Sequence, residues 1–332
     1  MKSPSHDLTV FGATSFVGQI LARYLFAQFG AHDGLKWALA GRSDQKLQRL
    51  RSSLGPKAAR LPIVVADAAD ADALEALCGQ TRVVISTVGP YALYGEPLVK
   101  ACAETGTDYC DLTGEAQWIR RMVHGYEKAA RKSGARIVHS CGFDSIPSDL
   151  GVHFLQQQAI ERFGEPCTRV KMRVKAMRGG FSGGTVASVL NLVKEATSNP
   201  ALRKELANPY SICPEGYAPE VRQPNVTSAQ FDDDFDSWVA PFVMSAINTR
   251  IVQRTNALSK QAYGADFTYD EAVLTGRGLQ GRLAATGMAA FMQFDSFPMA
   301  LLVSGSTVLV ATFIGVFVTT WMTGRIARMN SA

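Results

Sequence analysis

The chain has 332 residues, a length that accommodates two domains of ordinary size. Hydrophobic residues make up 47% of it and charged residues 19%, so the chain can bury a sizeable core. The formal net charge is +5 and the basic residues form no dense block, which argues against nucleic acid as a partner.

The cysteines and histidines give no sign of a metal centre. The six cysteines show no paired C-x-x-C spacing, so we expect neither a structural zinc site nor a dense disulfide framework. His124, His139 and His153 are scattered without metal-ligand spacing and are interpreted as ordinary structural residues. The N-terminus lacks the apolar core of a signal peptide. We therefore expect no metal and a reducing, cytosolic environment.

Strand-like and helix-like segments alternate over the first 140 residues. Short runs rich in Val, Ile and Leu are typical of strands buried on both faces. Repeated β-α-β units predict an α/β domain over residues 1–150, a doubly wound parallel sheet of Rossmann type. The expected strands are 8–11, 36–40, 61–65, 83–86, 108–110 and 136–140, and the expected helices are 17–29, 44–54, 71–77, 97–105 and 115–132.

The stretch "GATSFVG" follows the first strand and opens the first helix. A dinucleotide-binding loop uses glycine for a tight turn, for close approach to the pyrophosphate and for packing of the helix on the strand. Gly12 and Gly18 can fill the outer roles, whereas Ser15 stands in the middle and could donate to a phosphate oxygen. The alternative is a glycine turn that binds nothing. We expect cofactor contacts from Gly12, Ala13, Thr14, Ser15, Phe16, Val17 and Gly18.

The end of the second strand indicates which dinucleotide is bound. NAD enzymes usually place an acidic residue there for the ribose 2′-hydroxyl, but this chain has Arg42 and Ser43. Arg42 can pair with a 2′-phosphate and Ser43 can hydrogen-bond to it, which favours NADP(H) over NAD(H). The alternative is a solvated arginine that opens the next helix.

The ends of the third and fourth strands add further cofactor candidates. Asp67 could lie near the adenine or could cap the next helix. Thr87, Gly89 and Pro90 end the fourth strand, and strand ends at this edge face the cofactor crevice. These residues are small or rigid enough to line the ribose and nicotinamide.

Candidates for catalysis lie in the loops after the fourth, fifth and sixth strands. A tyrosine or a carboxylic acid could supply the proton that accompanies hydride addition. Asp144, Asp149 and Glu115 also suit helix starts, and for each residue taken alone that interpretation is favoured over catalysis. The catalytic residue is therefore left open, with Tyr91, Asp111 and Asp144 as leading candidates beside Thr113, Glu115 and Ser145.

The pattern changes after about residue 150. A helix over 149–164, a half-exposed strand within 167–179 and a helix over 182–199 are expected, whereas 208–230 reads as a loop and 240–285 is mixed. We therefore expect a second, α+β domain over 151–295. "SGGT", from Ser182 to Thr185, could aim helix N–H groups at a carboxylate, carbonyl or phosphate, or could be an ordinary helix cap.

The C-terminal stretch 296–324 holds no charged residue and predicts an apolar helix. Its length suffices to cross a hydrocarbon core. It could span a membrane, dip into one leaflet or pack within the second domain, and its hydrophobicity favours membrane contact. A membrane or lipid-droplet surface is therefore an expected partner, with the catalytic part on the cytosolic face, and a homo-oligomer is left open.

Several motifs taken together resemble the saccharopine dehydrogenase-like oxidoreductases, a family that includes the trans-acting enoyl reductases. They are "GATSFVG", "LAGRS", "VVISTVGPY", "YCDLTGE", "CGFDSIPSDLG" and "GGFSGGT", in the family's order over roughly residues 8 to 200. The family loop commonly has glycine at the position of Ser15 and threonine at that of Val17, and the family continues past the end of this chain. The resemblance implies a Rossmann domain, a covering α+β domain and NADP(H) or NAD(H) as redox partner.

Three functions follow as hypotheses. The first is an NADP(H)-dependent oxidoreductase acting on a lipid or other hydrophobic small molecule, with enoyl reduction in lipid or glycolipid metabolism as the reaction implied by the resemblance. The second is a membrane- or lipid-droplet-tethered protein that binds dinucleotide without turnover. The third is a saccharopine-type amine dehydrogenase.

Overall fold

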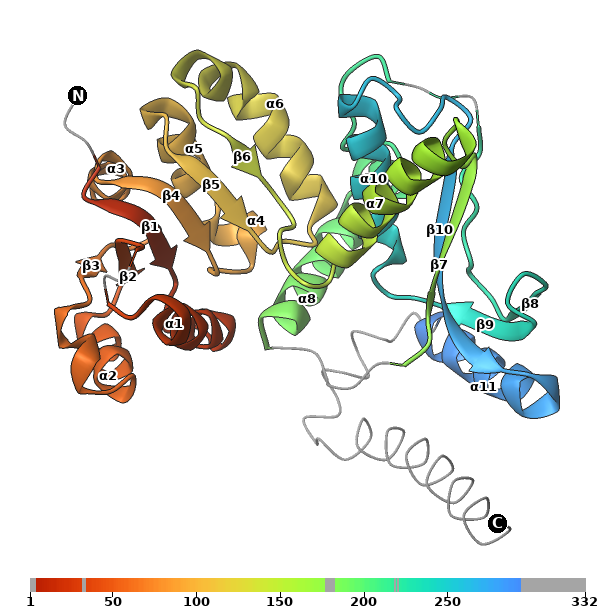
Figure 1. The fold of residues 1–332 in the computed structure, drawn as a ribbon, viewed down its shortest axis with the longest axis horizontal. Helices are drawn as coiled ribbons and strands as arrows, with labels where there is room; N and C mark the ends of the chain where they lie inside the picture. The colour runs from red at the N-terminus through yellow and green to blue at the C-terminus, as the bar shows by residue number, and fades with distance from the viewer. Residues whose placement is uncertain (1–3, 32–33, 177–182, 218, 220, 294–332) are drawn as a thin grey trace, which may run out of the picture.

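The first domain is built on a parallel sheet of six strands. The computed structural model describes residues 4–31, 34–176, 183–217, 219 and 221–293 (Figure 1). The strand order is β3-β2-β1-β4-β5-β6, and every neighbouring pair is parallel, which confirms the predicted doubly wound sheet. The strands are β1 (His6–Phe11), β2 (Trp37–Gly41), β3 (Ile63–Val65), β4 (Thr81–Ser86), β5 (Asp108–Asp111) and β6 (Ile137–Val138).

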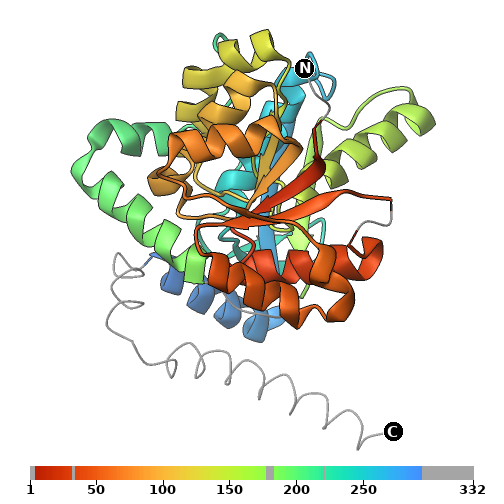
Figure 2. The ribbon, with the colours of Figure 1, turned by 90° about the vertical axis from the view of Figure 1, so that its left-hand side faces the viewer.

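Helices cover both faces of this sheet and bury a separate apolar core on each (Figures 1 and 2). On one face, α1 (Phe16–Phe29) and α2 (Asp44–Ser53) pack around the fully buried Trp37 of β2. On the other face, α3 (Ala71–Gly79), α5 (Glu96–Thr105) and α6 (Ala116–Ser133) pack around a larger cluster that includes Trp118. Burial on both faces explains the apolar runs of the central strands, of which β2 is buried at every position.

Short side chains fix where these helices begin. Ser15, Ser43 and Asp70 occupy the capping positions of α1, α2 and α3, and each accepts a hydrogen bond from a backbone N–H in the first turn. All five predicted helices are present. Sequence reasoning missed the short helices η1 (Pro56–Arg60) and α4 (Tyr91–Tyr94), which are too brief for an apolar repeat to reveal.

The second domain contains a mixed sheet of four strands in the order β7-β10-β9-β8. Strand β10 pairs parallel with β7 and antiparallel with β9, and β9 pairs antiparallel with β8, so the expected α+β class is confirmed. An apolar cluster joins α7 and α10 to β7 and β10, whereas α11 lies against β9 and β10. These elements are α7 (Ile146–Phe163), β7 (Arg169–Val174), β8 (Gln230–Asp232), β9 (Ser237–Pro241), α10 (Ser245–Leu258), β10 (Thr268–Gly276) and α11 (Gly278–Gln293).

Two more helices of this region lie between β7 and β8 in sequence. The helix expected over 182–199 is α8 (Gly183–Ser198), and α9 (Pro200–Ala207) follows it without having been predicted. Asn199 caps α9 by accepting from Leu202 N. Figure 1 shows α8 between the two sheets.

The apolar stretch 296–324 lies outside the described residues, so the predicted C-terminal helix is not part of this description. Among the helices that the structure does describe, none combines the length and the apolar character that crossing a bilayer requires.

A buried group of ion pairs holds β8 against β7 and β10. The side chain of Arg173, which is 1% exposed, lies 2.7 Å from a carboxylate oxygen of Asp232 and 2.9 Å from one of Asp270. Lys171 donates to the other oxygen of Asp232 at 2.9 Å. Burial by itself raises the pKa of Asp232, but the bonds from Lys171 and Arg173 outweigh it and hold that pKa below its usual value.

Replacing Asp232 with Asn should destabilise the protein, because it removes the carboxylate that Arg173 and Lys171 share, although Arg173 keeps Asp270 and Lys171 keeps Asp234. We expect a loss of about 1.5–3 kcal/mol in the free energy of unfolding at neutral pH, the range for hydrogen bonds to charged groups, measured by chemical denaturation. The lowered folded-state pKa means that this stabilisation is present above the unfolded pKa of about 4 and disappears as pH falls through the folded value. The gap between wild type and Asp232→Asn should therefore shrink in acid.

Asp236→Asn is the matched control, since Asp236 pairs with Arg277 at the surface, where both side chains are well exposed. Its effect should stay within about 1 kcal/mol. Equal losses for the two variants would contradict a special role for the buried group.

Candidate functional site

The loop after β1 is tied to the end of β2 by its backbone. Gly12 N and Ala13 N both donate to Ala40 O, at 2.9 and 3.1 Å. Gly12 has φ +81°, a left-handed conformation that glycine adopts without strain. The loop therefore turns sharply beside the strand that ends at Gly41.

The two outer glycines have the steric roles expected from the sequence. A Cβ added at Gly18 would lie 2.3 Å from Gly12 O, and one added at Gly12 would lie 2.6 Å from Val88 Cγ2. Real Cβ atoms essentially never come so close, so the start of α1 can approach the loop after β1 because Gly18 lacks a Cβ, and that loop can lie against Thr87 and Val88 because Gly12 lacks one. Phe16 and Val17 begin α1, and N–H groups at the first positions of a helix have no partner within it.

Ser15 is held inside the loop. Its Oγ accepts from Gly18 N at 2.9 Å and lies 2.9 Å from Thr87 Oγ1. Thr87 Oγ1 donates to a carbonyl, either Gly12 O at 2.8 Å or Phe11 O at 3.2 Å. Because a hydroxyl has one proton, Ser15 is left to donate to Thr87. The Ser15 hydroxyl therefore links the first turn of α1 to the residue that follows β4. A hydrogen bond from Ser15 to a phosphate stays a prediction.

The candidates for the adenosine end lie at the ends of β2 and β3. Arg42 is exposed and makes no hydrogen bond or ion pair with any described residue, whereas Ser43 caps α2. Asp67 is exposed and accepts from Ala69 N. The alternative that Asp67 caps the next helix is wrong, because Asp70 accepts from Ala73 N in that position.

The candidates after β4 separate into buried and exposed residues. Thr87 is buried, whereas Gly89 is exposed and Pro90 is half-buried just before α4. Tyr91 is buried against Trp118, its hydroxyl donates to Ser86 O at 3.0 Å, and Leu112 N donates to that hydroxyl at 3.4 Å. Burial, with the nearby charge of Asp111, raises the pKa of Tyr91. The hydroxyl proton of Tyr91 is thus used in a hydrogen bond inside the protein.

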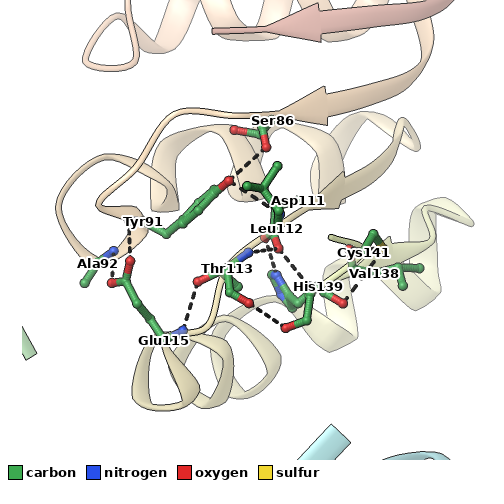
Figure 3. A network of polar contacts seen from close by, with 11 residues as sticks. Ser86, Tyr91, Ala92, Asp111, Leu112, Thr113, Glu115, Val138, His139 and Cys141 are labelled. Atoms are coloured by element: carbon green, nitrogen blue, oxygen red, sulfur yellow. Dashed lines mark hydrogen bonds and ion pairs between the residues drawn. The ribbon is translucent and has the colours of Figure 1, made fainter. Parts of the chain in front are cut away.

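Asp111 is the centre of a buried network at the ends of β5 and β6 (Figure 3). Its Oδ1 accepts from Thr113 N at 3.0 Å and from Ser140 N at 2.9 Å, and its Oδ2 lies 2.7 Å from His139 Nδ1. Ser140 has φ +60°, which is uncommon for serine, and its Oγ donates to Thr113 O. Asp111 therefore fixes the loops that follow two neighbouring strands.

Glu115 forms a second buried centre. Its carboxylate accepts from Tyr91 N at 2.8 Å and Ala92 N at 2.9 Å, as Figure 3 shows, and from Ser188 Oγ at 2.8 Å. Glu115 also stands at the start of α6, the structural role that the sequence favours. One side chain thus joins the loop after β4, the loop after β5 and helix α8.

Asp144 lies apart from these networks. It is exposed, Ser145 rather than Asp144 occupies the capping position of α7, and Asn248 of α10 donates to Asp144 O at 2.9 Å. Of the "SGGT" stretch, Ser182 lies outside the described residues and α8 begins at Gly183.

Sequence reasoning missed two features of the site. His139 was set aside, although parallel pairing of Cys110 with Val138 puts Asp111 and His139 next to each other, a signal available once the strand order is known. The other is a buried hydrogen-bonded carboxylate in the second domain, Glu271. Tyr269 Oη and Asn248 Nδ2 donate to it at 2.6 and 3.0 Å. Burial raises the pKa of Glu271. Within the described part of the chain, no group of three or more His, Cys, Asp or Glu residues could hold a metal ion.

The chain has known relatives. Residues 8–138 match the family described as the saccharopine dehydrogenase NADP binding domain. A trans-acting enoyl reductase of Mycobacterium bovis is 41% identical over 294 residues, which cover 85% of this chain and 68% of the relative. One of Mycobacterium leprae is 38% identical over 292 residues, covering 86% and 69%.

A Mycobacterium tuberculosis protein, provisionally described as a trans-acting enoyl reductase, is 44% identical over 276 residues, with 81% of this chain covered. The chain spans 65% of the length of that relative. Among solved structures, the apo saccharopine dehydrogenase (L-Glu forming) of Saccharomyces cerevisiae is similar over 48% of this chain and 32% of the other, with 20% identity and a TM-score of 0.34.

Gly18→Ala should disrupt the loop after β1, because the new Cβ would meet Gly12 O. We expect a loss of about 1–3 kcal/mol in the free energy of unfolding, the usual cost of overpacking, together with weaker binding of dinucleotide. Denaturation and NADPH fluorescence titration measure the two effects. Gly125→Ala is the matched control, since Gly125 is exposed within α6 and has open space around it. That variant should gain about 0.5–1 kcal/mol and keep its NADPH affinity; equal behaviour of the two variants would contradict the steric role.

Proposed function

Because the chain belongs to the saccharopine dehydrogenase-like family that includes the trans-acting enoyl reductases, we propose that it is an NADP(H)-dependent oxidoreductase that reduces an enoyl group on an apolar substrate. The observation that carries this proposal is the glycine loop between β1 and α1, in a chain 41% identical to a trans-acting enoyl reductase.

The residues present fit a dinucleotide. The missing Cβ atoms at Gly12 and Gly18 let the loop after β1 turn tightly against residues 87–88 and let α1 begin close against it, and the N–H groups of Phe16 and Val17 supply donors at a helix N-terminus. Arg42, unpaired within the described residues, supplies a cation for a 2′-phosphate. When NADPH is bound, it supplies the hydride.

An apolar rim supports a hydrophobic substrate. Large apolar side chains are exposed after β1, after β4 and after β6, where ligands of parallel sheets bind. They are Phe16 at 71%, Leu93 at 55%, Tyr94 at 50% and Phe143 at 89%. Exposed apolar groups gathered near a binding edge are typical of contact surfaces for apolar molecules.

Reduction of an enoyl group also consumes a proton, which the chain or solvent must deliver to the carbon beside the carbonyl. Tyr91 and Asp111 are engaged internally and serve to hold the loops in place. Of the three leading candidates, Asp144 is the one with an exposed side chain. We propose that Asp144 relays a proton from solvent, in which case Asp144→Asn should lower the rate of NADPH oxidation with an enoyl substrate.

The apolar stretch 296–324, although outside the described residues, supports a membrane or lipid-droplet surface as a partner. On this proposal the substrate reaches the crevice from a lipid phase. Co-sedimentation of the full chain with lipid vesicles measures the association.

The proposed activity is tested with α,β-unsaturated acyl thioesters of increasing chain length. We expect NADPH consumption that rises with chain length, because longer chains bury more apolar surface, followed as loss of absorbance at the nicotinamide band. Tight NADPH binding without consumption across the panel would favour the non-catalytic alternative. Reduction of NADP⁺ by saccharopine would favour the amine dehydrogenase.

Cofactor preference is tested at Arg42. Arg42→Ala should weaken NADPH binding about tenfold or more, the value of one charge-assisted bond to phosphate, and should change NADH binding little. Fluorescence titration of both cofactors gives the ratio. Arg49→Ala, which removes an exposed arginine of the nearby helix α2, is the control and should alter neither affinity. Equal losses for NADPH and NADH in Arg42→Ala would refute the NADP(H) preference.

A further inference from the structure

The buried carboxylate of Glu115 joins the two domains. It is 3% exposed and accepts from two groups of the first domain, Tyr91 N and Ala92 N, and from Ser188 Oγ of α8. Ser188 lies 73 residues further along the chain. A bond to a buried carboxylate is stronger than one between neutral groups, so this contact resists opening more than an exposed one does.

Glu115 itself stands on a fixed base. Its backbone N donates to Thr113 Oγ1 at 3.1 Å, and Thr113 N donates to Asp111 Oδ1. Residues 111–115 are thus held at the end of β5 and cannot easily follow a movement of α8. The partners that can shift are therefore Ser188 on one side and the segment before Tyr91 on the other.

That segment is short and leads directly to the cofactor loop. Thr87 bonds to Ser15 at 2.9 Å, and Tyr91, four residues later, bonds to Glu115. Whatever holds Tyr91 N and Ala92 N in place also holds the stretch proposed to line the nicotinamide. A second contact between α8 and the first domain, Arg121 with Glu195 at 3.9 Å, is more exposed and does not touch this stretch.

We infer that Glu115 is a positioning residue that couples the docking of α8 to the binding of NADPH. Closing the Ser188–Glu115 bond favours the arrangement of residues 87–92 that receives the nicotinamide, and a bound nicotinamide in turn favours the closed bond. This inference rests on the proposed NADPH binding and adds a link between the cofactor and the substrate-side helix.

Ser188→Ala tests the inference in the whole chain, because it removes the bond between Ser188 and Glu115 and leaves both backbone donors on Glu115. We expect the NADPH dissociation constant to rise about fivefold, within the usual range of coupling between sites. Hydrogen–deuterium exchange should show that NADPH slows exchange of the α8 amides in wild type and no longer does so in the variant. Coupling between two sites is reciprocal, so the fold-change in the NADPH dissociation constant and the lost protection of α8 should correspond to the same free energy.

Ser198→Ala is the matched control on the same helix, since Ser198 Oγ donates to carbonyl groups of α8 itself. It should keep wild-type NADPH affinity and wild-type protection of α8. Glu115→Gln provides a second route, because its amide nitrogen cannot accept a hydrogen bond; on that background Ser188→Ala should add less than it does in wild type.

The inference is overturned if Ser188→Ala binds NADPH like wild type, or if NADPH protects α8 equally in both. Such a result would leave the proposed activity untouched, because NADPH binding and consumption are measured independently. Failure of the wild type to bind NADPH would instead overturn the proposed function and the coupling with it.

Discussion

A buried carboxylate must receive hydrogen bonds, since an unpaired charge in the interior costs far more than a single bond returns. Asp111 and Glu115 are both almost fully buried at the carboxyl edge of the first sheet. Asp111 collects its donors from the loops after β5 and β6, and Glu115 collects them from the start of α4 and from α8. Satisfying these two side chains therefore fixes the position of most of the loops around the candidate site.

The loops of the candidate site are held in place by two different physical effects. In the loop after β1 the decisive property is the absence of side-chain atoms, since a Cβ at Gly12 or Gly18 would overlap its surroundings. In the loops after β5 and β6 the decisive property is a set of directed bonds to buried side chains such as Asp111. A position that has no room for a Cβ tolerates almost no substitution. A buried hydrogen bond, by contrast, can be replaced by another of similar geometry.

This difference explains what the sequence could predict. The strands of the first domain were found because burial on both faces leaves continuous apolar runs, and the glycine loop because steric demands leave a fixed spacing. Residues 240–285 could not be assigned, because the second sheet is mixed in direction and only partly covered by helices. The family was found from its motifs, and relatives at 38% identity or more confirm it.

The exact start of a helix and the contacts between distant residues were not predicted. Asp67 and Asp70 both precede α3, and only the exact start of that helix decides which of them caps it. His139 meets Asp111 through the register of two strands, and Ser188 meets Glu115 across a domain boundary. Composition and periodicity report burial, whereas such contacts depend on how separate elements are placed.

Ser15 shows how an exception in the motif fits the rest of the site. Glycine at that position would leave Gly18 N without its side-chain acceptor and Thr87 without its hydroxyl partner. With serine, the first turn of α1 is fastened to the end of β4, only a few residues before the segment that Glu115 holds. A continuous line of hydrogen bonds and backbone then runs from the loop after β1 through residues 87–92 to Glu115 and α8. The serine that departs from the glycine motif thus ties that loop to the segment that Glu115 holds.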